Sequence, residues 1–375
     1  NARKLFFAAA WSPALANIVT IGFFCLLPLT KSGDNLSIDA VQHDQAAIWF
    51  LGLGTTLGIV VMAIAQGAAV LRHGVTFTFA PQFAHPAVKK LVRLSLWTLG
   101  YVAANQVALV VIKNLASPGS GGVDAYSKAF VLLQLPHGLL AVSIATTFVP
   151  DLARMFHRGD HQQFSLLMAN GIRLTALFTI PASCGLWVMS KPIIGLLFQH
   201  GNFSAAATAN TARALSGLAI GLAGFSIYLF VLRGFYARND TRTPFFINVG
   251  ENAINIVLAI VLVDRHGVFG LGLSFSIAYL VSAIVALLIL ESTEVDIKLT
   301  VLAFNIVRIA IAAGAMTCVV WFSIRHIGSE AGIGSLTRVI AGTLIGAATY
   351  AVALSALGEK TMRDYLSSKI TKSSR

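Results

Sequence analysis

The chain has 375 residues, of which 56% are hydrophobic and only 11% are charged. Soluble domains carry about 25% charged residues, so a soluble fold of this size would leave much apolar surface uncovered. The 27 Lys and Arg and 15 Asp and Glu give a net charge of +12, but the cations stand in short gaps between apolar runs. This distribution excludes a disordered chain, a coiled coil, a disulfide scaffold and a nucleic-acid-binding protein, and it favours a polytopic membrane protein.

Ten apolar runs are long enough to cross a bilayer, which takes about 20 helical residues. Because backbone groups in lipid must bond within their own segment, we expect an all-α bundle of about ten transmembrane helices. The fourth run carries Lys128, Gln134, Pro136 and His137, so we expect it to face protein or a water-filled cavity. The runs are residues 5–29, 46–71, 91–115, 125–149, 164–189, 207–232, 244–263, 268–290, 302–324 and 336–357.

The loops between these runs differ in charge from one side of the membrane to the other. Most Lys and Arg residues fall on the side that also holds both chain ends. By the positive-inside rule we expect that side, and both ends, to be cytoplasmic. The chain opens with Asn1 rather than Met, and we expect it to be part of a longer or processed protein.

Two charged residues lie well inside runs, where each costs several kcal/mol. Arg173 lies about nine residues into its run, or roughly 13 Å, near the middle of the bilayer. It either meets an anionic substrate in a cavity or forms a structural pair with Glu251 or a carbonyl group. Glu251 shares its helix with three amides, Asn248, Asn252 and Asn255. Their spacing places this polar stripe toward the bundle interior, where it lines a cavity, binds a cation or joins helices.

The sequence contains none of the common enzyme active-site motifs that we looked for. We find no H-E-x-x-H, no Walker loop, no Gly-x-Ser-x-Gly and no Cys-x-x-Cys, and we expect no enzyme activity. A transferase acting on lipid pyrophosphates would need Asp and His on its loops, and the only cluster near that pattern (Asp151, His157, Asp160, His161) is better explained as a solvated loop. The Gly-x-x-x-Gly pairs at Gly54/Gly58, Gly217/Gly221 and Gly342/Gly346 indicate close helix packing.

One segment between two runs has an unusually specific order: Arg233-Gly-Phe-Tyr-Ala-Arg-Asn-Asp-Thr-Arg-Thr-Pro244. With it the chain resembles the MurJ (MviN) lipid II flippases of the MOP transporter superfamily. We expect the segment to form a positively charged cytoplasmic loop, and its motif residues are Arg233, Arg238, Asp240, Arg242 and Pro244. Supporting matches are Trp11–Asn17, Leu135–Leu139, Phe148–Asp151, Gly171–Leu174, Leu197–Gly201 and Arg213–Leu215.

The resemblance implies a fold of fourteen spans, of which this chain supplies the last ten. Residues 1–71 would end the first lobe, residues 90–290 would form the second, and residues 300–357 would add two helices that form a lipid-tail groove. Residues 358–375 would be a cytoplasmic tail. The absent first four spans carry the family's cluster of cavity arginines.

The resemblance also implies a function. The protein would turn the undecaprenyl-pyrophosphate-linked peptidoglycan precursor from the cytoplasmic to the outer leaflet of the bacterial inner membrane by alternating access. Arg173 matches a cavity arginine, and Pro13 and Asn17 match the Pro-x-Leu-x-Asn of a cavity-lining helix. Partners would be the lipid-linked precursor, membrane lipids and cell-wall synthesis proteins. No cofactor is implied; Na⁺ bound near Glu251, or the membrane potential, would drive transport.

Other functions stay open at this point. Another MOP-type transporter, either a polysaccharide-lipid flippase or a drug/cation antiporter, would have a similar pattern of spans. An antiporter would favour acidic cavity residues, whereas this chain offers a central arginine. A non-transporting membrane scaffold for cell-wall enzymes would need neither Arg173 nor the Asn stripe.

Overall fold

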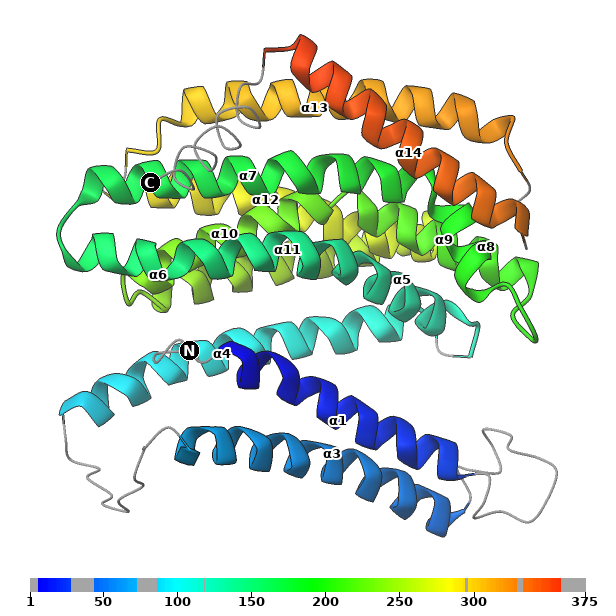
Figure 1. The fold of residues 1–375 in the computed structure, drawn as a ribbon, viewed down its shortest axis with the longest axis horizontal. Helices are drawn as coiled ribbons and strands as arrows, with labels where there is room; N and C mark the ends of the chain where they lie inside the picture. Colours follow the sequence, from blue (N-terminus) through cyan, green and yellow to red (C-terminus); the bar gives the residue numbers. More distant parts are fainter. Residues whose placement is uncertain are drawn as a thin grey trace. The chain divides into compact units, whose positions relative to one another are not determined.

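The computed structural model describes residues 6–27, 44–72, 86–117, 119–293, 296–328 and 333–358. In these residues the regular structure is helical throughout. The chain separates into two compact units, Asn1–Phe83 and Ala84–Arg375. Figure 1 shows the helices of both units as ribbons.

The first unit contains α1 (Phe6–Leu26) and α3 (Gln45–Arg72), which pack together as a hairpin. The glycine pair predicted for packing lies at this contact: a Cβ on Gly58 would come within 2.8 Å of the Ala16 carbonyl oxygen. The Gln66 side chain donates to the Ser12 hydroxyl (2.7 Å) near the other end of the hairpin. Close backbone approach and one interhelical hydrogen bond therefore join the pair.

The second unit contains the remaining helices, which cover eight of the ten predicted runs. They are α4 (Pro86–Leu115), α5 (Gly122–Pro136), the π-helix η2 (His137–Val142), α6 (Ser143–His157), α7 (His161–Val188), α8 (Ser190–Phe198), α9 (Ala205–Ala219), α10 (Leu222–Ala237), α11 (Arg242–His266), α12 (Val268–Glu291), α13 (Leu299–Arg325) and α14 (Ile333–Ala356).

Among the described residues, eight helices are long and apolar enough to cross a membrane. The α9–α10 pair forms a ninth candidate span bent by 46°, and α1 contributes a shorter apolar stretch from Trp11 to Leu26. Within the residues that the structure describes, each of the ten predicted runs thus lies on a helix or on a joined set of helices. The all-α membrane fold is confirmed.

Three backbone features were not predicted. The run at residues 207–232 is broken at Ile220–Gly221, where Gly221 donates to the Leu218 carbonyl (3.0 Å) and a new helix starts. A short helix, α8, follows α7. The fourth run forms one 36-residue span with a π-helical turn after Pro136. Hydropathy averages over a window and does not register such local changes of backbone hydrogen bonding.

α13 and α14 pack against each other, and α13 also lies along α7 (Figure 1). The predicted glycine pair on α14 lies in this region. A Cβ on Gly342 would come within 2.6 Å of the Met189 sulfur, and one on Gly346 within 3.2 Å of Val320. These glycines let α14 approach its neighbours closely, as the sequence predicts.

α9 and α12 pack closely against each other in the second unit. A Cβ on Gly217 would lie 2.6 Å from the Phe269 carbonyl oxygen, and Ser276 donates to the Gly217 carbonyl (2.6 Å). We expect Gly217→Ala to lower the free energy of unfolding by about 1–3 kcal/mol, because the methyl group must displace backbone. Denaturant unfolding in detergent measures the change.

The matched control is Gly250→Ala on α11, where a Cβ meets nothing within 4 Å. Alanine has the better helix propensity, so this variant should be as stable as the parent or slightly more stable. Equal destabilisation by both changes would contradict the packing role of Gly217.

Candidate functional site

Arg173 lies on α7, about 18 Å along a helix of 28 residues, which is close to mid-length. Its side chain is half-buried. α7 packs against α6, α10 and α13, whereas Glu251 lies on α11 among residues of α4 and α12. The structure therefore does not bring Arg173 and Glu251 together, and the structural pair between them that the sequence left open is not formed.

A hollow of about 340 Å³ lies at the N-terminal end of α7, between that helix and the segment before α13. Ala169, which lines it, precedes Arg173 by four residues and shares its helix face. The hollow is therefore one helical turn from Arg173. Five of its eight lining residues are polar or charged, and they carry both signs of charge. The lining residues are His161, Gln162, Ser165, Leu166, Ala169, Asp296, Ile297 and Lys298.

An apolar pocket of about 340 Å³ lies toward the opposite end of α7. It is formed by α7, α8, α13, α14 and the end of α5; its walls are almost entirely apolar. Between the two hollows, the Tyr350 hydroxyl of α14 donates to the Leu177 carbonyl (2.7 Å), one turn beyond Arg173. The lining residues are Pro136, Pro181, Ala182, Gly185, Leu186, Met189, Ile193, Met316, Val320, Gly342, Thr343, Gly346 and Ala347.

The polar stripe of α11 is buried, as its spacing predicts. Glu251 is only 1% exposed, and the three amides are buried with it. Asn248 donates to the Glu251 carboxylate (3.3 Å) and exchanges hydrogen bonds with Asn105 of α4 (3.2 and 3.4 Å). Asn255 accepts from Ser274 of α12 (3.0 Å). The stripe thus links three helices.

A cavity of about 200 Å³ adjoins this network. Five of its lining residues are polar: Asn105, Gln106, Glu251, Asn252 and Asn255. The aromatic rings that line it include Tyr126 and Tyr279. Carboxylate and amide oxygens are the ligands that hard cations prefer. The cavity is therefore the place in the second unit where a small cation could meet a carboxylate inside the membrane.

The structure adds partners that sequence reasoning missed. Asn105 is an amide inside an apolar run, and that signal alone could have identified it as a membrane-buried polar group. Tyr126, Tyr279 and Ser274 gave no comparable signal, because aromatic and small hydroxyl residues are common in membrane helices. Lys113, at the end of α4, does not line the cavity.

The fourth run meets protein at two of its polar positions. Lys128 pairs with Asp124, and His137 Nδ1 lies 3.0 Å from the Ser226 hydroxyl of α10. Gln134, however, is exposed on the surface of the second unit, so no protein wall of that unit covers it. The expectation of protein contact holds for Lys128, which also lies 5.4 Å from the Phe203 ring, and for His137. For Gln134 the alternative, a water-filled cavity, stays a prediction.

The motif at residues 233–244 is mostly helical rather than a loop. Arg233 lies in α10, and only the four residues Arg238–Thr241 separate α10 from α11. Asn239 adopts a left-handed conformation (φ 60°). The backbone N–H of Asp240 donates to the Phe235 carbonyl (3.0 Å), which completes a Schellman motif at the end of α10.

The second half of the motif starts α11. The Asp240 carboxylate accepts from the backbone N–H groups of Arg242 and Thr243 (3.0 Å each), and Pro244 lies in the first helical turn, where its missing N–H is not needed. Arg238 donates to Thr293 and lies 5.7 Å from the Phe156 ring. The unusual residue order is therefore explained by a tight turn between α10 and α11 that also contacts the C-terminal ends of α6 and α12.

The Asp and His cluster weighed for transferase chemistry serves local structure. Asp151 pairs with Arg154 (3.2 Å), His157 interacts with its own helix at Ala153, and Asp160 caps α7. Among the described residues, no group of three or more His, Cys, Asp or Glu side chains is arranged to hold a metal ion. Pro13 and Asn17 both lie exposed on α1 in the first unit.

Helices of this length and hydropathy define a multi-pass membrane protein. The family model for the lipid II flippase MurJ matches residues 1–342. The chain therefore belongs to the MurJ lipid II flippase family.

A curated relative agrees with this assignment, and solved structures share the fold. A probable lipid II flippase MurJ of Rhizobium meliloti is 30% identical over 331 residues, covering 86% of this chain and 59% of that protein. The chain thus spans only part of the curated relatives' length. A MurJ structure in an inward closed conformation aligns with 97% of this chain and 69% of its own (TM-score 0.70, 23% identity). A MATE in complex with MaL6 covers 76% of this chain and 62% of its own (TM-score 0.60, 13% identity).

The Asn105–Asn248 contact can be tested by a double-mutant cycle. We expect each change to alanine to destabilise the protein by about 1–3 kcal/mol, because the remaining amide is left buried without its partner. The double variant should lose about 1 kcal/mol less than the sum of the single losses. Denaturant unfolding in detergent gives the three values, and simple additivity would contradict the contact.

Proposed function

We propose that the protein is a lipid II flippase that translocates the undecaprenyl-pyrophosphate-linked peptidoglycan precursor from the cytoplasmic to the outer leaflet by alternating access. Membership of the MurJ family supports this proposal. The single structural observation that carries it is Arg173 at mid-length of a membrane helix, between a polar hollow and an apolar pocket. A phosphate carrier with an isoprenoid tail needs both environments.

In this proposal Arg173 receives the diphosphate. The planar guanidinium donates paired hydrogen bonds that match phosphate oxygens, and these bonds are strong away from bulk water. The hollow at the N-terminal end of α7 gives the headgroup a polar approach to within one turn of Arg173. Pro13 and Asn17 of the first unit, which match a family motif, are also proposed to contact the substrate.

The lipid tail is proposed to follow α13 and α14. The apolar pocket of about 340 Å³ lies against both helices and offers few polar groups, so an isoprenoid chain would be desolvated there at little cost. The headgroup and the tail would therefore use different ends of α7.

We further propose that the N-terminal ends of α4, α7, α11 and α13 face the cytoplasm, with both chain ends inside, in the bacterial inner membrane. The excess of Lys and Arg in the loops on that side supports this orientation. Precursor-making and precursor-using cell-wall proteins would be the partners on the two sides.

Rescue of a depleted strain by the full-length protein tests the substrate role. We expect Arg173→Ala to abolish growth and to cause precursor to accumulate in the inner leaflet, because the diphosphate loses its cation. Arg173→Lys keeps the charge but not the planar fork and should rescue only in part. Leaflet-specific labelling of the precursor measures the outcome.

Arg308→Ala is the matched control, because Arg308 also lies in a membrane helix but stacks on the Phe304 ring of its own helix (4.2 Å). It should support growth at near-normal precursor distribution. Normal growth with Arg173→Ala would remove Arg173 from the mechanism.

The driving force is proposed to involve a cation bound at Glu251. The cavity places a carboxylate and amide oxygens together inside the membrane. Glu251→Gln keeps the shape and hydrogen-bonding reach of the side chain but removes its charge. We expect this variant to lose the cation dependence of precursor transport in proteoliposomes, and to lose more than tenfold in rate at saturating cation. An unchanged cation dependence would discard the ion site and leave the membrane potential as the driving force.

A further inference from the structure

Three aromatic rings meet where the N-terminal ends of α4 and α11 cross. The Trp97 ring of α4 lies 5.3 Å from Phe245 and 5.7 Å from Phe246 of α11, and these two rings are 5.2 Å apart. A Cβ on Gly100 would come within 2.8 Å of the Phe245 ring, so the missing side chain allows this contact. The cluster is therefore a fixed part of the helix interface.

Arg242 lies over this cluster. The centre of its guanidinium is 5.8 Å from the Trp97 ring and 5.7 Å from the Phe246 ring, within the range of cation–π attraction. Its side chain is exposed, and among the described residues it makes no ion pair or side-chain hydrogen bond. A guanidinium stacked on rings keeps its edge N–H groups available, and these groups match phosphate oxygens.

Further positive charge lies on the same end of α4. Arg93 precedes Trp97 by one helical turn and Lys89 precedes Arg93 by another, and both side chains are exposed. The positive ends of two helix dipoles add to these charges. Asp240 is an acidic residue of this corner, and its carboxylate already accepts hydrogen bonds from two backbone N–H groups of α11. The net local charge therefore favours an anion.

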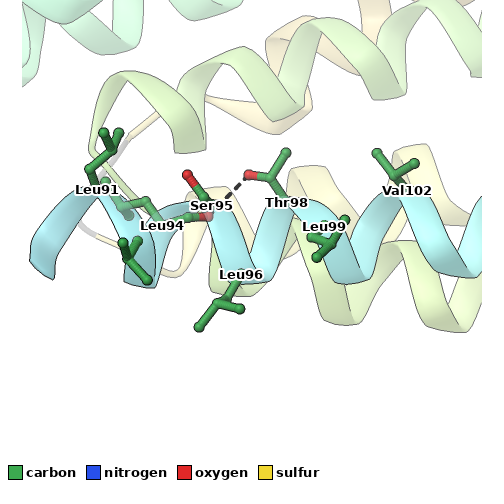
Figure 2. A pocket seen from close by; sticks show the side chains of 8 residues that line it. Leu91, Leu94, Ser95, Leu96, Thr98, Leu99 and Val102 are labelled. Atoms are coloured by element: carbon green, nitrogen blue, oxygen red, sulfur yellow. Dashed lines mark hydrogen bonds between the residues drawn. The ribbon is translucent and has the colours of Figure 1, made fainter. Parts of the chain in front are cut away.

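Apolar surface continues directly from this basic end. Val92, Leu96 and Leu99 of α4 are 52–65% exposed, and Phe246 is 53% exposed. Figure 2 shows the α4 side chains that border a hollow of about 710 Å³; the Thr98 hydroxyl donates to the Leu94 carbonyl (3.1 Å), so the helix's own backbone satisfies it. Trp97 lies about six residues into the candidate span, where interfacial tryptophans are common.

We propose that this corner binds an anionic phospholipid, with Arg242 and Arg93 on the headgroup phosphate and the exposed face of α4 along an acyl chain. The stacking of Arg242 on Trp97 and Phe246 fixes the guanidinium in advance, so less side-chain freedom is lost on binding. Basic sites between membrane helices commonly hold anionic lipid headgroups. This inference concerns a membrane lipid and does not depend on the transported substrate.

The test compares lipid selectivity of the full chain reconstituted in phosphatidylcholine vesicles. Spin-labelled phosphatidylglycerol and spin-labelled phosphatidylcholine, added in trace amounts, report how strongly each lipid associates with the protein. We expect a preference for phosphatidylglycerol that falls by up to about fivefold for either Arg242→Gln or Arg93→Gln. The control pair Arg154→Gln with Arg158→Gln removes two exposed cations from another corner and should keep the preference.

Variants that keep the charge distinguish a preformed binding site from attraction by diffuse surface charge. Trp97→Leu removes the ring under Arg242 without changing any charge and should lower the preference, whereas Trp97→Phe should retain it. Arg242→Lys keeps the charge but not the flat guanidinium, and it serves if Trp97→Leu does not fold. Full selectivity in Trp97→Leu or in Arg242→Lys, or an equal loss in the control pair, would overturn the proposal.

Discussion

A polar group inside a membrane bundle must find its partners within the protein, and this constraint organises the second unit. The α11 stripe satisfies this constraint with one amide and one hydroxyl from two other helices. Asn105 of α4 bonds Asn248, and Ser274 of α12 bonds Asn255. Serine and threonine hydroxyls elsewhere bond carbonyls of their own helix, as Thr175 and Thr179 do on α7. Charged residues are the groups that such local bonds satisfy least well, which is why Arg173 and Glu251 carry the functional argument.

The helical structure and the approximate positions of the apolar runs could be predicted from the sequence, because a span needs a fixed length of apolar residues whatever its neighbours are. The breaks inside spans could not. The bend at Ile220–Gly221 and the π-turn after Pro136 depend on which carbonyl a given N–H selects, and that choice is made by packing against other helices. Gly217 illustrates the difference, since its motif predicted close packing but not that the partner would be Phe269 of α12.

The candidate site, too, could be predicted from the sequence only in part. The burial of the stripe followed from helical spacing on α11, because position along one helix determines which side chains share a face. The neighbours across the interface depend on tertiary packing, so Asn105, Tyr126 and Tyr279 were missed. The motif at residues 233–244 was assigned to a charged loop, but Asn239 and Asp240 form a tight turn and helix cap there.

The separation of Arg173 from Glu251 has a consequence for mechanism. The two charges lie on different helices of the second unit and do not neutralise each other by direct pairing, so each is compensated in its own surroundings. A carboxylate in an apolar medium is stable there only with a proton, a cation or enough donors, and Asn248 and Tyr279 provide side-chain hydrogen bonds to Glu251. In the proposed mechanism, substrate charge and coupling charge would thus act at two separate sites. Movement of the second unit as a whole, rather than a relay of side chains between them, is the simpler way to link their occupancy.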